Sequence, residues 1–133
     1  MAITILIADD HDDNRELLQF LLTGAGYQVR AAADGNECLA LARQQPPDLI
    51  LMDLSMPGMD GWTVFRELQS DSHTRAIPCL AVTAHAGLDR QQTLESGFSG
   101  YVSKPFRTTD LLQTVATILA NRESDAVSKS QGA

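Results

Sequence analysis

The chain has 133 residues, of which 44% are hydrophobic, and a formal net charge of −7. This length suits one domain with a real core, and the negative charge argues against direct nucleic-acid binding, which needs a basic patch. No apolar run approaches the ~20 residues that a membrane-spanning helix requires, and no secretory signal precedes the first strand. Cys38 and Cys79 lie far apart in apolar patterns, so we expect buried free thiols and a cytoplasmic location.

Apolar and β-branched runs alternate with apolar stripes at helical spacing, which predicts five strand–helix units. The expected strands are residues 3–8, 27–31, 49–52, 77–84 and 100–103. The expected helices are residues 14–23 after the cap Asp13, the segment from the cap Asp34 to Pro46, residues 62–68, residues 89–96, and a last helix that begins at Thr108 or Thr109.

The alternation of these units predicts the fold class. Residues 49–52 are apolar throughout, which indicates a strand buried on both faces of a parallel sheet. Residues 27–31 are more polar and are expected at an edge. Strict alternation of strands and helices favours an α/β fold, in which helices cover both faces of a parallel sheet through right-handed crossovers.

The end of the chain has a different composition. Residues 1–121 are expected to form the domain, whereas residues 122–133 are polar and lack the apolar positions that a core needs. We therefore expect a disordered C-terminal tail and no second domain. The start at Met1 favours an independent protein.

Polar residues that follow the strands carry the candidate chemistry. Asp9 and Asp10 follow the first strand, Asp53 follows the third, Thr83 lies near the end of the fourth, and Lys104 follows the fifth. The carboxyl ends of parallel strands meet at one edge about 4.8 Å apart, so these residues can share a site. Three carboxylates would repel one another without a cation, and Mg²⁺ is the hard ion that suits oxygen ligands. A hydroxyl and an ammonium group beside them are what an incoming phosphoryl group needs.

Taken in order, these residues resemble the receiver domain of two-component response regulators, over about residues 3–120. The matching parts are Asp9-Asp10, Asp53 ahead of Met56-Pro57-Gly58-Met59-Asp60-Gly61, Thr83-Ala84, and Tyr101 three residues before Lys104-Pro105. The resemblance implies a flavodoxin-like (βα)5 three-layer fold with the strand order 2-1-3-4-5.

The resemblance also implies a function. Asp53 would accept a phosphoryl group from a sensor histidine kinase or a histidine phosphotransfer protein, and a monomer or phosphorylation-dependent dimer would switch or relay the signal. The protein would not be a conventional enzyme, because it would assist only its own Mg²⁺-dependent phosphorylation and dephosphorylation. Asp10, Asp53 and the carbonyl of Ser55 would bind Mg²⁺ directly, with Asp9 acting through bound water.

Three further residues complete the implied site. Thr83 and Lys104 would contact the phosphoryl oxygens, and Thr83 would move together with Tyr101 as the switch. The peptide bond between Lys104 and Pro105 would be cis, which proline permits at small cost.

Two other classes of protein compete with this interpretation. A haloacid-dehalogenase-like phosphohydrolase would carry a general acid two residues after the nucleophile, where this chain has Ser55. A flavodoxin-like cofactor binder would need a phosphate-cradling loop after the first strand, but residues 9–13 are acidic and repel phosphate without a metal. His11 and His85 are interpreted first as surface residues, although His85 lies where this family tunes access to the phosphoryl group. The phosphorylation-switched module is favoured.

Overall fold

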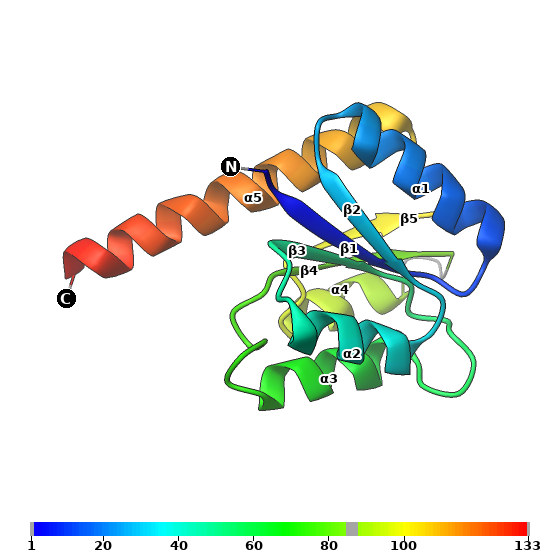
Figure 1. The fold of residues 1–133 in the computed structure, drawn as a ribbon, viewed down its shortest axis with the longest axis horizontal. Helices are drawn as coiled ribbons and strands as arrows, with labels where there is room; N and C mark the ends of the chain where they lie inside the picture. Colours follow the sequence, from blue (N-terminus) through cyan, green and yellow to red (C-terminus); the bar gives the residue numbers. More distant parts are fainter. Residues whose placement is uncertain (1, 85–87, 133) are drawn as a thin grey trace.

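The computed structural model describes the backbone of residues 2–84 and 88–132. It describes the side chains of the same residues except 88–89 and 123–132. Strands and helices alternate along this part of the chain (Figure 1). The strands are β1 (Thr4–Ala8), β2 (Gln28–Ala32), β3 (Leu49–Met52), β4 (Cys79–Thr83) and β5 (Gly100–Ser103). The helices are α1 (Asp12–Gly24), α2 (Gly35–Gln44), α3 (Gly61–Ser70), α4 (Leu88–Glu95) and α5 (Thr108–Gly132).

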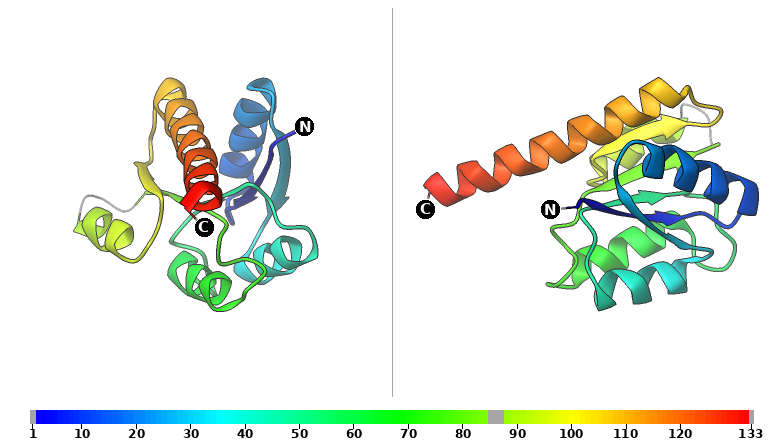
Figure 2. Two further views of the ribbon diagram at one scale, coloured as in Figure 1. Left: turned by 90° about the vertical axis from the view of Figure 1, so that its left-hand side faces the viewer. Right: turned by 45° about the horizontal axis from the view of Figure 1, so that its top comes forward.

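All of the described strands lie in one parallel sheet with the order β2-β1-β3-β4-β5. Helices α1 and α5 cover one face of the sheet, and α2, α3 and α4 cover the other (Figure 2). This arrangement confirms the predicted flavodoxin-like α/β fold, its strand order and the edge position of β2. Strand β1 lies between β2 and β3 and pairs with both. Because β1 and β3 are parallel neighbours, their carboxyl ends lie side by side.

Two cores, one on each face of the sheet, hold the layers together. On β1, Ile5 and Ile7 belong to the core beneath α1 and α5, while Leu6 and Ala8 belong to the core beneath α2 and α3. Successive residues of a strand point to opposite faces, so an apolar strand can serve both cores. Every residue of β3 is buried, as its unbroken apolar run predicts.

Both cysteines are buried free thiols, as predicted. Cys38 and Cys79 belong to the core beneath α2 and α3. Burial, with a smaller contribution from the carboxylate of Asp34, raises the pKa of Cys38 to about 12. A thiol with such a pKa stays protonated at neutral pH and is a poor nucleophile.

The first helix begins earlier than predicted. Helix α1 starts at Asp12, and His11 occupies the N-cap position without a capping hydrogen bond from its side chain. Asp13 was predicted to be the cap but lies inside the first turn, where an acidic side chain is stabilised by the positive end of the helix dipole. Asp34, by contrast, does cap α2, since its carboxylate accepts a hydrogen bond from the Glu37 backbone N–H at 2.8 Å.

The last helix continues through the segment that was predicted to be a disordered tail. Helix α5 has 25 residues and extends to Gly132, away from the rest of the fold (Figure 1). No proline and no glycine interrupt this segment before Gly132, so nothing in its sequence ends the helix. Among the described helices, none combines the length and the apolar character that crossing a membrane would require.

Arg122, the residue after the expected domain boundary, ties α5 to the amino end of the sheet. Its Nη1 lies 2.6 Å from Oδ1 of Asp48, whose Oδ2 accepts a hydrogen bond from the Thr4 backbone N–H at 2.8 Å. Burial by itself would raise the pKa of Asp48, but the hydrogen bond from Thr4 and the guanidinium of Arg122 together lower it below its ordinary value.

This lowered pKa predicts a pH-dependent contribution to stability. The ionised form of Asp48 is favoured in the folded state, so its contribution is present above the pKa of the unfolded chain and is lost as the pH falls through the lower folded pKa. Asp48→Asn should therefore lower the free energy of unfolding at pH 7, and this difference should shrink below about pH 4. The Asp48 side chain is 35% exposed, so the difference should stay below about 1 kcal/mol. Urea unfolding at several pH values measures it, with Glu16→Gln, an exposed acidic residue beyond the first turn of α1, as control. A pH-independent difference would contradict the assignment.

Candidate functional site

The backbone aligns two aspartates at the carboxyl edge of the sheet. The Asp53 N–H donates to the Ala8 carbonyl at 2.9 Å, and the Asp9 N–H donates to the Ala32 carbonyl at 3.1 Å. These bonds continue the sheet one residue beyond β1 and β3, so Asp9 and Asp53 lie side by side. Their exposed fractions are only 1% and 4%, and buried carboxylates require compensating partners.

Lys104 supplies the compensating charge. Its Nζ lies 2.8 Å from Oδ2 of Asp9 and 3.2 Å from Oδ2 of Asp53. Its backbone N–H donates to the Thr83 carbonyl at 2.8 Å, which ties the end of β5 to the end of β4. The Lys104–Pro105 peptide bond is cis, as the resemblance implied. One ammonium group therefore bridges the two buried carboxylates.

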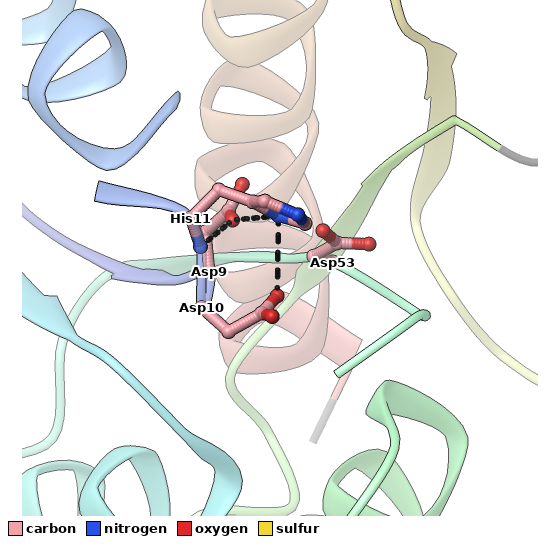
Figure 3. A group of neighbouring side chains, drawn as sticks. All are labelled: Asp9, Asp10, His11 and Asp53. Atoms are coloured by element: carbon pink, nitrogen blue, oxygen red, sulfur yellow. Dashed lines mark hydrogen bonds and ion pairs between the residues drawn. The ribbon is translucent and has the colours of Figure 1, made fainter. Parts of the chain in front are cut away.

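Asp10 and His11 complete an acidic cluster with Asp9 and Asp53 (Figure 3). One potential ligand atom from each residue lies within 4.8 Å of the others. The Oδ1 atom of Asp10 is buried and accepts no hydrogen bond from the described residues, although Nδ1 of His11 lies 3.3 Å away. A buried oxygen without a donor is costly, and a cation with oxygen ligands would satisfy it. These donors fit Mg²⁺.

The histidine ring lies at the rim of this cluster. The His11 side chain is 62% exposed, in agreement with its interpretation as a surface residue, and its backbone N–H donates to Oδ1 of Asp9 at 2.9 Å. His85 lies outside the described residues. The sequence interpretation of His11 therefore described its exposure correctly but missed its closeness to the carboxylates.

The loop after β3 is held tightly against Asp53. The Ser55 backbone N–H donates to Oδ1 of Asp53 at 3.0 Å. At Gly61, an added Cβ would lie 2.6 Å from the Asp53 carbonyl oxygen and 2.8 Å from Cα of Leu54, so only glycine fits there without a shift. Asp60 caps α3 by accepting a hydrogen bond from the Thr63 N–H at 2.8 Å. The start of α3 thus fixes the backbone that presents the Asp53 carboxylate.

Arg15 is a supporting residue that the sequence interpretation missed. Its Nη1 donates to the Asp9 carbonyl oxygen at 2.8 Å, and its other terminal nitrogen pairs with Asp12. This contact fixes α1 against the end of β1. The only signal in the sequence was an arginine six residues after Asp9, on the helix that follows it.

The predicted switch residues lie on neighbouring strands. Thr83 is fully buried and pairs in register with Ser103, while Tyr101 pairs with Ala81. Tyr101 is 7% exposed and belongs to the core beneath α2 and α3. The structure therefore places both residues in the β4–β5 part of the sheet beside Lys104.

Comparison with known proteins gives relatives over most of the chain. Residues 5–116 match the response regulator receiver domain. The chain is 44% identical over 119 residues to the response regulator PleD of Caulobacter vibrioides, covering 89% of this chain and 26% of PleD, so it spans about a quarter of that relative. It is 34% identical over 122 residues to the polar-differentiation response regulator DivK of Brucella ovis, covering 91% of this chain and 99% of DivK.

A solved structure with a related sequence shares the fold. The receiver domain of the sensor histidine kinase PA1611 from Pseudomonas aeruginosa PAO1 is 31% identical, with a TM-score of 0.82 over 90% of this chain and 99% of that domain. That structure has a magnesium ion coordinated in its active site cleft. The fold and the matches define a signalling domain of two-component systems. The chain belongs to the family of response regulator receiver domains.

Proposed function

We propose that this domain, residues 1–121 with Arg122, accepts a phosphoryl group on Asp53 in the cytoplasm and passes a signal on through protein contacts. The donor would be the phosphohistidine of a sensor histidine kinase or a histidine phosphotransfer protein. The position of Lys104 Nζ, 2.8 Å from Asp9 and 3.2 Å from Asp53, is the observation that supports this most strongly. An ammonium group held there can neutralise charge on an arriving phosphoryl group.

The proposed transfer needs little chemistry beyond positioning. An oxygen of Asp53 attacks the phosphorus, the P–N bond breaks, and the donor histidine keeps the electron pair of that bond and takes a proton from solvent. Lys104 and the Thr83 hydroxyl would contact the phosphoryl oxygens. Mg²⁺, held by Asp10, Asp53 and the Ser55 carbonyl with Asp9 acting through water, would stabilise the charge that develops. The protein would assist only its own phosphorylation and dephosphorylation.

The face of α1 is the proposed docking surface for the donor, because α1 begins beside the cluster and bears exposed apolar side chains. Leu17 on α1 is 48% exposed. Leu94 on α4, which lies outside the proposed docking surface, is exposed to a similar degree, 40%. Leu17→Ser should slow transfer from the cognate phosphohistidine protein, by about tenfold if the leucine is an anchor of that interface. Leu17→Ser should leave labelling by acetyl phosphate unchanged, since this small donor does not need to dock on α1.

Phosphotransfer profiling against the kinases and phosphotransfer proteins of the cell measures this effect, with Leu94→Ser as the matched control. If Leu17→Ser slows acetyl phosphate labelling to the same degree, the residue supports the fold and not the docking. If no phosphohistidine protein in the panel labels the wild-type protein, the proposed function itself is contradicted.

The proposed output depends on Thr83 and Tyr101. Phosphorylation adds about −1.5 to −2 charge and three acceptor oxygens, which would draw the Thr83 hydroxyl inward and bias the position of Tyr101. Coupling of this kind amounts to ~1–3 kcal/mol, so binding of a downstream partner, or dimerisation, should change by tens of fold. Amide exchange with beryllofluoride as the phosphoryl mimic should show altered protection from residue 84 to 112. Changes confined to the loops that carry Asp9, Asp10 and Asp53 would favour a relay role in place of this switch.

A further inference from the structure

A groove of about 550 Å³ lies between α3 and α4, formed by side chains that the proposed site does not use. Trp62, Phe65 and Arg66 of α3 line one side, and Gln92 of α4 and Ser96, which directly follows α4, line the other. The groove combines aromatic surface, two neutral polar side chains and one cation. Grooves with this mixture, mostly apolar with a few polar groups, are typical of binding sites.

Packing beneath the groove holds its aromatic floor in place. The ring of Phe98 stacks on Phe65 with centroids 4.2 Å apart, and the ring of Trp62 meets Phe98 edge-on at 6.1 Å. Gly97 has a φ of +116°, and a Cβ there would lie 3.2 Å from the Phe65 ring. The missing side chain at Gly97 therefore permits this close packing, and the floor is formed before any ligand arrives.

Arg66 gives the groove its charge. The only interaction of its side chain with the described residues is a hydrogen bond to Oγ1 of Thr63 at 3.3 Å. By contrast, Arg15, Arg43 and Arg122 each pair with a carboxylate. Arg66 thus lies beside an aromatic groove and has no carboxylate partner among the described side chains, although the chain has a net charge of −7. Such an arginine is suited to bind an external anion.

We propose that the groove between α3 and α4 binds an apolar segment of a partner protein in which a carboxylate side chain lies next to an aromatic or aliphatic anchor. The anchor packs on Trp62 and Phe65, and the carboxylate pairs with Arg66, which can bind it through two parallel hydrogen bonds. Gln92 and Ser96 offer hydrogen bonds to the backbone of the segment. This interaction is separate from phosphoryl transfer and does not depend on it.

Two small probes of the same size, one charged and one neutral, test the charge preference of the groove. 3-Phenylpropionate carries the anchor and the carboxylate, and 3-phenylpropionamide has the same size without the charge. Both are titrated into the full chain and followed by NMR, where Trp62, the only tryptophan in the sequence, gives a single indole N–H signal. The acid should shift the signals of Trp62 and Gln92 and bind about two- to fivefold more tightly than the amide, the range expected for an exposed ion pair.

Variants assign the preference to one side chain. Arg66→Gln should make the two probes bind equally, while Arg75→Gln, an exposed arginine outside the groove, should keep the preference for the acid. The proposal is overturned if neither probe shifts signals from the groove, if the wild-type protein binds acid and amide equally, or if Arg66→Gln retains the preference.

Discussion

Replacing Asp53 by asparagine will abolish phosphoryl addition to the protein. The carboxylate is the nucleophile of the proposed transfer, and an amide of nearly the same shape cannot form the acyl phosphate. After incubation with acetyl phosphate and Mg²⁺, intact-mass measurement should show one added phosphoryl group in the wild-type protein and none in Asp53→Asn. Asp9 and Asp10 have the proposed role of holding Mg²⁺, through water and directly, so they should not substitute for Asp53.

Two controls make this result specific. Asp12→Asn removes an 80% exposed carboxylate from the first turn of α1 and should leave labelling intact. A thermal melt of Asp53→Asn should show that it remains folded, since the asparagine can still accept the hydrogen bond from the Ser55 N–H. Equal labelling of the wild-type protein and Asp53→Asn would show that another residue is the acceptor.

Mg²⁺ will stabilise the wild-type protein, and Asp10→Ala will remove this effect. The buried Oδ1 atom of Asp10 accepts no hydrogen bond from the described residues, so the folded protein already contains an oxygen suited to a cation. A ligand present at 100 times its dissociation constant stabilises the folded state by about 2.7 kcal/mol. For a domain of this length that corresponds to a rise in melting temperature of several degrees, which thermal melts with and without millimolar Mg²⁺ will detect.

Asp13→Ala is the matched control for the metal, because Asp13 is an exposed acidic residue near the cluster that is not among its potential ligands. It should respond to Mg²⁺ as the wild-type protein does. A wild-type protein whose melting temperature does not respond to Mg²⁺, or an Asp10→Ala variant that responds fully, would contradict the assignment of the metal site.

The fold and the closeness of the acidic residues at one edge of the sheet could be predicted, because both depend on short-range patterns in the sequence. The apolar run before Asp53 marks a strand buried on both faces, and parallel strands bring their carboxyl ends together. Asp9, Asp53 and Lys104 could therefore be assigned to one edge before their distances were known. Strand ends were less well predicted: β4 is Cys79–Thr83 and so shorter than the expected 77–84, since apolar neighbours of a strand look like the strand itself.

Other features depend on contacts that spacing does not reveal. Arg122 and Asp48 are 74 residues apart, and polar composition alone placed Arg122 in a tail. The close approach of Gly61 to the Asp53 carbonyl oxygen and the contact of Arg15 with Asp9 both follow from how a helix packs against the sheet. Polar composition predicted a disordered segment after residue 121, but a helix needs only the absence of breakers to continue, and α5 extends to Gly132.

The most direct test of the central claim is to locate the phosphoryl group after transfer from a phosphorylated histidine phosphotransfer protein. Borohydride reduces an aspartyl phosphate to homoserine, and peptide mass spectrometry then identifies the modified position. The proposed function predicts homoserine at position 53 and at no other aspartate. Homoserine at position 9 or 10, or a phosphoryl group retained on a histidine or a hydroxyl side chain, would contradict it.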